Sequence, residues 1–409
     1  MPTISQKAHR MPESPIRKLM PFAVKAKSEG KKVLHLNIGQ PDIKTPDVVL
    51  EKMKSIDRTV IEYAPSEGFA SYREKLASYY QNRGIPVKAE EIMVTTGGSE
   101  ALIFAMMTCF DQDDEVIIPE PYYANYSGFA TMADVKVVPV TSQIENGFAL
   151  PSISAFEALI TEKTKGIVLC NPGNPTGRLY TREELQRIAA LAKKFDLYII
   201  ADEVYREFCY DGAQPFSAYN LEGLEENVIL IDSVSKRYSM CGARVGALIT
   251  RNTKVRKAAM KFAQARLSPP TFGQIAAEAA LETPQSYFDE VIEEYVARRD
   301  FTVSELNKIP GVLCPLPSGA FYCIAQLPID NSDRFCQWLL ESFSYKNTTV
   351  MLAPATGFYI TRGLGEQEVR LAYVLNKRDL RTALEILSKA LEVYPGRIAE
   401  NANILSSSI

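Results

Sequence analysis

One lysine, which follows a short apolar run, offers the clearest chemistry in this sequence. Val228–Ile231 predicts a buried strand, and Lys236 lies just past its end among serines. Two glycines follow, where a backbone turns tightly or approaches a ligand closely. A lysine in such a place is a surface cation, a phosphate clamp or an amine that bonds covalently to a carbonyl. Taken alone, this stretch favours the surface cation, because most lysines are solvated.

Other loops at the ends of predicted strands carry matching polar groups. Gly98 and Ser99 open a predicted helix, whose N-terminal N–H groups and serine hydroxyl suit a phosphate. Asn174 lies in a loop with prolines on both sides, which hold its amide in place. Each of these features also has an ordinary interpretation as turn chemistry.

Asp202 ends another apolar run, and Tyr205 follows three residues later. A carboxylate at the end of a buried strand needs a partner, which is either a helix N-terminus or a cationic ligand atom. Ser233 and Arg244 lie three residues before and eight residues after Lys236, so both side chains can reach one phosphate. Together with the lysine, these groups are the complement that holds pyridoxal phosphate. The lysine forms the imine, the carboxylate keeps the pyridine nitrogen protonated, and the amide and phenol bind the phenolic oxygen.

Composition narrows the function classes. The chain has 409 residues, 46% of them hydrophobic, and a net charge of −3, so no global basic field favours nucleic acid or an anionic membrane. The N-terminus lacks the apolar run of a signal peptide, and no apolar run has transmembrane length. Seven scattered cysteines without a Cys-x-x-Cys pair indicate a reducing, cytoplasmic location and no zinc site. His9, in an N-terminal tail expected to be mobile, and His35, in a strand, are the only histidines, so we expect no metal site and no histidine triad.

The pattern of elements predicts an α/β fold. Short apolar runs alternate with helical patterns, which implies a mostly parallel central sheet with helices on both faces. The predicted strands are Ile92–Thr95, Glu115–Ile118 (closed by Pro119), Val135–Val140, Gly166–Cys170, Leu197–Asp202 and Val228–Asp232. After about residue 290 a long helix precedes shorter strands, which indicates a smaller α+β domain and a frayed tail at Asn401–Ile409. We therefore expect residues 1–45 to join the small domain, 46–290 to form the large cofactor-binding domain and 291–409 to form the small domain.

In this order the motifs resemble the fold-type I, pyridoxal-phosphate-dependent class I/II aminotransferases, aspartate aminotransferase-like branch. Ser233-x-x-Lys236 followed by Gly-x-Arg244-x-Gly is the most specific match. The other matching stretches are Asn37–Asp42, Tyr63 with Gly68 and Arg73, Thr96–Ala101, Asn171–Gly177, Asp202–Tyr205, Pro317–Tyr322 and Val369–Ala372. The resemblance extends from about Ile16 to Val393, judged with the usual boundary error.

The resemblance implies roles for individual residues. Lys236 is the Schiff-base lysine and proton carrier, Asp202 pairs with the pyridine nitrogen, and Asn174 and Tyr205 bind the phenolic oxygen. Gly98, Ser99, Ser233 and Arg244 form the phosphate cup. Tyr123 takes the place of the aromatic residue, often tryptophan in the family, that stacks on the cofactor ring. Gly39, Asn174 and Arg370 contact the substrate, and Arg370 binds its α-carboxylate. Tyr63 enters the neighbouring subunit's site in a homodimer with shared sites.

The implied activity is transamination between an L-amino acid (an aspartate, alanine or aromatic donor) and a 2-oxo acid, with 2-oxoglutarate as the expected acceptor. The mechanism is ping-pong, through aldimine and ketimine forms. Arg266 does not match the offset of the second arginine in dicarboxylate-specific relatives, so a helix-surface cation is the preferred interpretation; Tyr322, Phe358, Tyr359 and Asn125 are candidates for shaping the pocket. Two alternatives stay open: a pyridoxal-phosphate-dependent β-C–S lyase, and the effector domain of a transcriptional regulator, which the lack of a DNA-binding extension disfavours.

Overall fold

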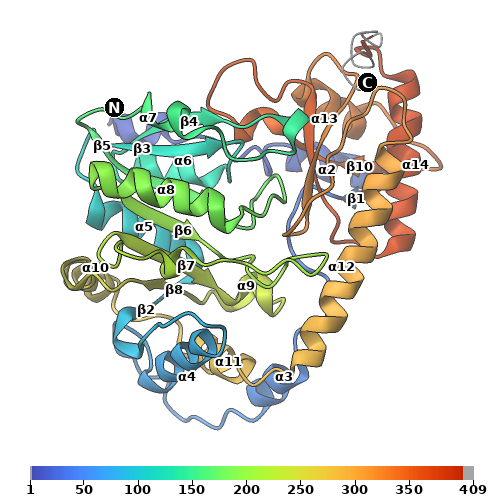
Figure 1. Cartoon of the computed structure of the whole chain (residues 1–409). Coiled ribbons are helices and arrows are strands. Elements are labelled where there is room, and N and C mark those ends of the chain that lie inside the picture. Colours follow the sequence, from blue (N-terminus) through green and yellow to red (C-terminus); the bar gives the residue numbers. More distant parts are fainter. Residues whose placement is uncertain (1, 399–409) are drawn as a thin grey trace.

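A seven-stranded sheet forms the centre of the larger part of the molecule (Figure 1). The computed structural model describes residues 2–398, so the predicted tail Asn401–Ile409 lies outside the described residues. The strands, in their order across the sheet, are β2 (Ile92–Thr95), β8 (Gly246–Ile249), β7 (Val228–Ser233), β6 (Tyr198–Asp202), β5 (Thr164–Cys170), β3 (Glu115–Glu120) and β4 (Lys136–Thr141). The five strands from β7 to β4 run parallel, and β8 pairs antiparallel with both β7 and β2. The predicted mostly parallel sheet is confirmed.

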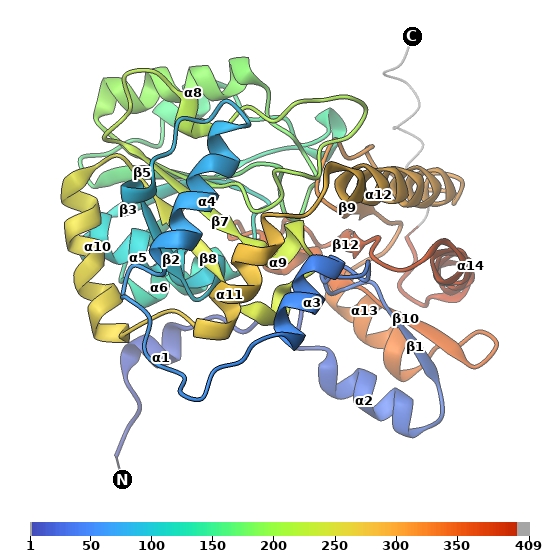
Figure 2. The same cartoon turned by 90° about the horizontal axis from the view of Figure 1, so that it is seen from below.

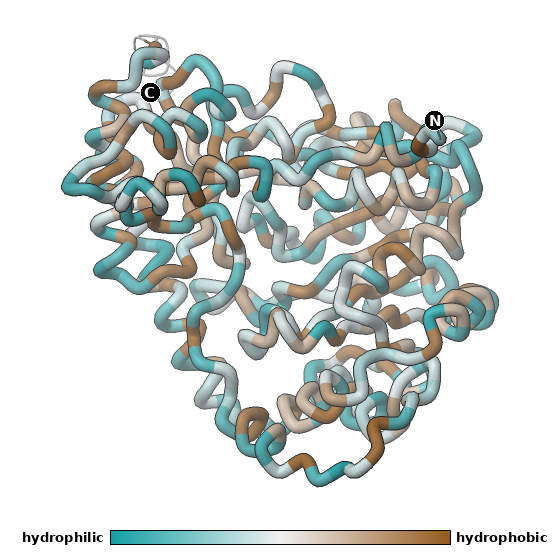
Figure 3. Tube along the Cα trace, turned by 180° about the vertical axis from the view of Figure 1, so that it is seen from behind, coloured by the Kyte–Doolittle hydropathy of each residue, from teal (hydrophilic) through white to brown (hydrophobic). Residues whose placement is uncertain are grey.

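Helices cover both faces of this sheet (Figure 2). Alternate residues of each strand point to opposite faces, so Ile200 packs with one apolar cluster while Ile199 packs with the other. The first cluster includes α5 (Gly97–Cys109), α6 (Asn125–Met132) and α10 (Thr253–Arg266), and the second includes α4 (Ala70–Gln81), α7 (Ile153–Glu157), α8 (Arg182–Phe195) and α11 (Thr271–Ala280). Apart from the edge strand β4, the strands are almost entirely buried on both sides, and Figure 3 shows apolar residues along much of the interior.

The smaller part of the fold combines both ends of the chain. β1 (Lys32–His35) pairs in parallel with β10 (Thr348–Met351), while β12 (Glu368–Ala372) lies between β11 (Ala353–Pro354) and β9 (Tyr322–Gln326) in an antiparallel sheet. One apolar cluster joins β1, β9, β10 and β12 to their helices, which are α2 (Met20–Ser28), α12 (Gln285–Leu306), α13 (Ser332–Glu341) and α14 (Lys377–Val393). The pairing of β1 with β10 agrees with the placement of the N-terminal segment in the small domain, although the boundaries at 45 and 290 remain a prediction.

The structure differs from the sequence prediction at three places. Pro119 does not close β3, because the strand runs through it to Glu120. β8 had no prediction, since its few residues lie among glycines. The N-terminal tail forms a short helix, α1 (Gln6–Arg10), and Lys7 and Arg10 pair with Asp134 at 2.5 and 3.1 Å. α3 (Asp47–Lys54) and α9 (Val234–Arg237) complete the α-helices of residues 2–398, and none of the helices there is long and apolar enough to cross a bilayer.

Candidate active site

A cavity of about 270 Å³ opens at the carboxyl ends of the central strands. Cys170, Asp202 and Ser233 are the last residues of the neighbouring strands β5, β6 and β7, and all three line it. Parallel strands bring their C-terminal ends to one edge, which is where α/β sheets bind ligands. Of the twelve predicted site residues, the eleven that line this cavity are Gly39, Gly98, Ser99, Tyr123, Asn174, Asp202, Tyr205, Ser233, Lys236, Arg244 and Arg370.

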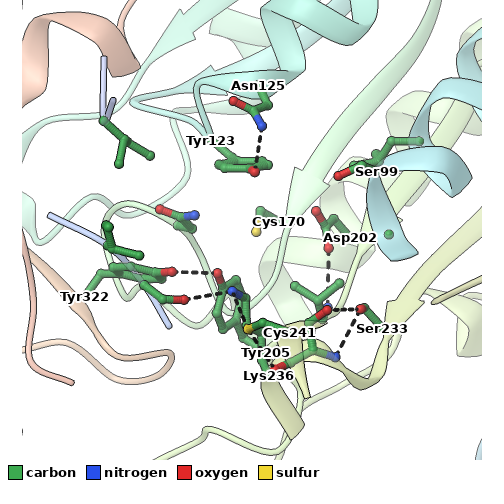
Figure 4. A pocket seen from close by; sticks show the side chains of 18 of the residues that line it. Ser99, Tyr123, Asn125, Cys170, Asp202, Tyr205, Ser233, Lys236, Cys241 and Tyr322 are labelled. Carbon is green, nitrogen blue, oxygen red and sulfur yellow. Dashed lines mark hydrogen bonds between the residues drawn. The ribbon is translucent and has the colours of Figure 1, made fainter. Parts of the chain in front are cut away.

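Lys236 extends into the cavity from the short helix α9 (Figure 4). Its Nζ donates to the carbonyl oxygen of Gly39 at 2.8 Å and lies 3.8 Å from Sγ of Cys241. Within residues 2–398 no carboxylate forms an ion pair with this amine. The amine is therefore presented to the cavity, and the interpretation as a surface cation is wrong.

Asp202 is a buried carboxylate that pairs with no cation among residues 2–398. It is 4% exposed, and it accepts hydrogen bonds from Tyr126 Oη at 2.6 Å and from the Val204 N–H at 3.3 Å. Burial raises the pKa of Asp202 to about 6, although the Tyr126 hydrogen bond opposes this shift. A cationic ligand atom in the cavity would compensate this burial cost.

Two polar pairs stand beside Asp202 and Lys236. The hydroxyls of Tyr205 and Tyr322 are 2.9 Å apart, and burial raises the pKa of Tyr205 well above its usual value. Oδ1 of Asn174 accepts a hydrogen bond from Nη1 of Arg370 at 2.9 Å. These pairs hold an amide and a phenol at the same cavity wall, as the sequence predicts.

Arg370 is the most buried cation of the cavity. It lies in β12, the middle strand of the small sheet, is 1% exposed, and packs against the rings of Tyr322 and Phe358. Within the described part of the chain it has no acidic partner, and its Nε has no hydrogen-bond partner. Burial therefore lowers the pKa of this guanidinium. A buried arginine with donors to spare suits a carboxylate bound in the cavity.

The opposite wall has the features of an anion cradle. Helix α5 begins at Gly97 without a side-chain cap, so its first N–H groups are free to bind a ligand. Gly97 has φ +76°, and a Cβ there would lie 2.4 Å from Nη2 of Arg244, so only glycine leaves room for the guanidinium. Oγ of Ser233 lies 2.8 Å from Oγ of Ser235. This donor set fits the phosphate of pyridoxal phosphate.

Tyr123 occupies the predicted stacking position, and Nδ2 of Asn125 donates to its hydroxyl at 2.8 Å. Its ring makes an edge contact with Tyr126, at 5.5 Å between centroids. The sequence analysis missed Tyr126, the partner of Asp202, although it lies only three residues after Tyr123, in the first turn of α6.

Four residues considered from the sequence lie outside the cavity, namely Tyr63, Arg266, Phe358 and Tyr359. Phe358 packs against the guanidinium of Arg370, and Tyr359 donates a hydrogen bond to Glu368 at 2.7 Å. Tyr63 is 79% exposed and does not line the cavity. Arg266 donates to the carbonyl oxygens of Ser66 and Val94 and pairs with Glu100 at 3.3 Å, so it is a structural cation of this subunit. The preferred interpretation of Arg266 as a cation exposed on a helix surface is therefore only half right, since its contacts bury most of it.

Several lining residues had no sequence signal. The N-terminal segment contributes Ser14, Ile16 and Arg17, and the cysteines Cys170 and Cys241 also reach the cavity. Nothing in their local sequence distinguishes them from ordinary turn or core residues, because their role arises only when distant segments meet.

Comparisons with known proteins agree with this geometry. The family model of aminotransferase class I and II matches residues 31–387. An aspartate aminotransferase of Pyrococcus horikoshii is 32% identical over 95% of this chain and 97% of its own, and aromatic-amino-acid aminotransferase 2 of Thermococcus litoralis is 31% identical over 95% and 98%. The solved aspartate aminotransferase of Thermus thermophilus with maleate superposes with a TM-score of 0.87 at 30% identity, over 96% of this chain and 100% of that one.

The match covers the whole described fold rather than one motif. The fold is therefore the aspartate aminotransferase-like, fold-type I α/β architecture that the sequence predicted. Since the family model spans both the large sheet and the small one, the chain belongs to the class I and II aminotransferases and is a transaminase.

Proposed function

We propose that this transaminase uses pyridoxal phosphate to move an α-amino group between an L-amino acid and a 2-oxo acid. One observation carries the proposal: Lys236 and Arg370 line the same cavity, one as a primary amine and the other as a buried guanidinium without an acidic partner in the described chain. An amine that reacts with a carbonyl and an arginine that binds a carboxylate are what an amino-acid transaminase requires.

The donor set supports pyridoxal phosphate at this site. Ser99, Ser233 and Arg244, with the free N–H groups of α5, would hold the phosphate. Asp202 would keep a proton on the ring nitrogen, while Tyr123 would stack on the ring. When bound, the group supplies an aldehyde carbon for the amino group and a ring that accepts electrons from the substrate's α-carbon.

The chain's own residues perform the binding and the proton transfers. Arg370 binds the α-carboxylate with two N–H groups and so orients the α-carbon towards the amine. The Nζ of Lys236 then removes the proton from that α-carbon as a general base, and the Gly39 carbonyl, 2.8 Å away in the structure, helps to position the amine. Asn174, held by Arg370, and Tyr205 present their donors on the same wall.

The exposed face around Tyr63 supports a homodimer with shared sites. The loop between α3 and α4, at the bottom of Figures 1 and 3, exposes Val60, Ile61 and Tyr63 by 65, 59 and 79%. The Ser66 hydroxyl donates to the Leu267 carbonyl oxygen and the Thr271 hydroxyl donates to the Glu62 carbonyl oxygen, so this loop lies beside a fourth exposed apolar side chain, that of Leu267, which is 52% exposed. We propose that a second copy covers this patch and receives Tyr63 in its own site.

Two further expectations continue as proposals. The seven cysteines are all free thiols, which supports a reducing, cytoplasmic location. The separate apolar clusters of the large and small sheets support a division into two domains near residues 45 and 290.

The donor amino acid is proposed among aspartate, alanine and aromatic amino acids, with 2-oxoglutarate as the acceptor. The relatives include aminotransferases named for aspartate and for aromatic amino acids, and a solved alanine aminotransferase of Pyrococcus furiosus superposes with a TM-score of 0.87 at 28% identity. The alternative of a β-C–S lyase would use the same lysine, so the test must separate the two reactions.

A visible absorption spectrum of the purified protein, before and after single amino acids are added without an oxo acid, tests the proposal. We expect a band of bound pyridoxal phosphate that converts to the pyridoxamine form, with release of the matching oxo acid. A band that persists while pyruvate and ammonia accumulate would favour the lyase. A protein that shows no band even after addition of pyridoxal phosphate would overturn the proposal.

A further inference from the structure

Two buried phenols from distant parts of the chain meet at the cavity wall. Oη of Tyr205, which follows β6, lies 2.9 Å from Oη of Tyr322, the first residue of β9, and Figure 4 marks this bond with a dashed line. Within residues 2–398 neither hydroxyl has another hydrogen-bond partner. One of the two O–H groups therefore makes the bond between the phenols. The other is free to bind a ligand in the cavity that both residues line.

The hydroxyl of Tyr322 occupies a space that the backbone leaves open for it. A Cβ added to Gly39 would lie 1.6 Å from this Oη and 2.3 Å from Cζ of the same ring, so only glycine leaves room for the phenol. The carbonyl oxygen of Gly39 accepts from Nζ of Lys236 at 2.8 Å and, in the described part of the chain, takes no hydrogen bond from Tyr322. Tyr205 is therefore the only partner for the Tyr322 hydroxyl among residues 2–398.

A cation sets the direction of the bond between the phenols. The guanidinium of Arg370 lies over the Tyr322 ring, 4.6 Å from its centroid, whereas among the described residues no cation lies over the Tyr205 ring. This charge draws electron density from the Tyr322 ring, so the Tyr322 hydroxyl is the stronger donor and the weaker acceptor of the two. Arg370 has donors only and cannot accept the Tyr322 proton. Tyr322 therefore donates to Tyr205, and the free proton is that of Tyr205.

The charged and titratable groups around this pair come from both parts of the fold. Burial raises the pKa of Tyr123 to about 12 and also raises the pKa of Tyr205, so these phenols stay protonated between about pH 5 and pH 9. Arg370 keeps its charge in that range, although burial lowers its pKa. Asp202, whose pKa burial raises to about 6, is the same in every variant compared below. The groups that face the pair are Cys170 at the end of β5, Asp202 at the end of β6, Tyr123 ahead of α6, Lys236 of α9, Tyr295 of α12 and Arg370 of β12.

We propose that Tyr322 is a positioning residue, which donates to Tyr205 and so directs the Tyr205 proton towards the phenolic oxygen of the bound cofactor. This inference rests on the proposed function and adds a residue to it. Two consecutive hydrogen bonds polarise each other, so Tyr205 is a stronger donor while it accepts from Tyr322. A stronger donor draws negative charge from the phenolic oxygen, which lowers the proton affinity of the nitrogen that joins the cofactor to Lys236.

The test follows the visible band of the lysine-bound cofactor as a function of pH, without substrate. Tyr322→Phe removes the hydroxyl and keeps the ring over Arg370. We expect the pH midpoint of the band to rise by about 0.3 to 1 pH unit, which is an increase in proton affinity of about two- to tenfold. In a spectroscopic titration of the cofactor-free protein, the Kd for pyridoxal phosphate should rise by about the same factor. An unchanged midpoint in Tyr322→Phe would overturn the inference.

Tyr373→Phe is the matched control. It also removes one buried hydroxyl, which donates to the Ala320 carbonyl oxygen at 3.3 Å, and it does not line the cavity. Any general loss of packing in the small sheet should therefore lower the melting temperature of both variants, whereas only Tyr322→Phe should move the midpoint of the band. Equal shifts of the midpoint in both variants would overturn the inference.

A double-variant cycle shows whether Tyr322 acts through Tyr205. Tyr205→Phe should raise the midpoint by itself, and adding Tyr322→Phe should then change it no further, because the hydroxyl that Tyr322 directs is gone. The same shift from Tyr322→Phe in both backgrounds would mean that Tyr322 acts by another route, and would overturn the inference.

The cycle also separates this inference from the proposed function. A wild type that shows the band and these shifts yet does not transaminate would leave the role of Tyr322 standing and overturn the proposed function. A wild type that transaminates while Tyr322→Phe keeps its midpoint would do the reverse. A protein that shows no band after addition of pyridoxal phosphate would overturn both.

Discussion

Nη1 of Arg370 donates to Oδ1 of Asn174 at 2.9 Å, a contact that spans 196 residues of the chain. Arginine has donors only, so the amide oxygen must face it and the amide nitrogen must face the other way. The strand that binds the α-carboxylate in our proposal thereby sets the direction in which Asn174 donates. The small sheet and the large sheet thus share one hydrogen-bonded unit.

We expect substitutions in this pair to be non-additive. Arg370→Lys removes the planar guanidinium with its paired N–H donors, and Asn174→Ala removes the amide. Each substitution should lower kcat/KM for every amino acid. Because the residues are in contact, the double variant should deviate from the sum of the two effects by about 0.5–3 kcal/mol. Steady-state kinetics on the four proteins measures this coupling. As a control, the effects of Lys25→Gln and Asn174→Ala on the free energy of activation should add, because these residues are not in contact. Additive effects of the Arg370 and Asn174 substitutions would contradict the coupling.

Much of this arrangement could be predicted from the sequence, because it depends on strand ends. Asp202 and Ser233 follow apolar runs, and parallel strands place their ends at one edge. The cavity accordingly contains every predicted site residue except Tyr63. The resemblance to a family then supplied what the local pattern lacks, namely that Gly39 and Arg370 join the same site from the distant ends of the chain.

The remainder depends on contacts between distant segments. Arg17 enters the cavity only because α1 and Lys18 are held by Asp134 and Asp333. Local pattern indicates only that the residues around His9 form a mobile tail, and it reveals none of these ion pairs. Likewise Tyr126 matters through a bond to Asp202 across 76 residues, which no local periodicity reveals.

Lys236→Ala should retain the fold and lose the activity. The amine makes one short hydrogen bond, to the Gly39 carbonyl oxygen, so its removal costs little stability. We expect an unchanged melting temperature, no visible band of a lysine-bound cofactor, and a fall in kcat of at least about 10²-fold. Lys236→Arg keeps the charge and should be equally inactive, because a guanidinium is not nucleophilic at neutral pH. Catalytic transamination by either variant would refute the role of the lysine.

Asp202 should make the cofactor-free protein less stable at higher pH. Burial raises the pKa of this carboxyl to about 6, above its usual 3.8, so the folded state binds the proton more tightly than the unfolded chain. Its stabilising contribution is therefore fully present below about pH 4 and is lost as the pH rises through about 6. Asp202→Asn should remove this dependence. Between about pH 4 and pH 7.5 the free energy of unfolding of the variant should therefore rise by about 3 kcal/mol relative to that of the wild type.

Urea denaturation of the cofactor-free proteins at pH 4 and pH 7.5 measures this gain. Asp57→Asn, at an exposed position outside the cavity, serves as the control and should follow the wild type at both pH values. If the difference in free energy of unfolding between Asp202→Asn and the wild type were the same at both pH values, the buried carboxyl would not titrate in this range.

Gly97→Ala should weaken cofactor binding through Arg244. The added Cβ would lie 2.4 Å from Nη2 of that arginine, so the guanidinium would have to leave the start of α5. The substitution also carries backbone strain, since Gly97 has φ +76°, and this costs about 1–2 kcal/mol.

Gly30→Ala is a matched control, because Gly30 has φ +85° and no atom within 4 Å of an added Cβ. Both variants should lose similar stability in thermal denaturation, whereas only Gly97→Ala should raise the Kd for pyridoxal phosphate, by about tenfold or more, in a spectroscopic titration. An equal change of Kd in both variants would show that backbone strain, and not the place of Arg244, controls the phosphate cradle.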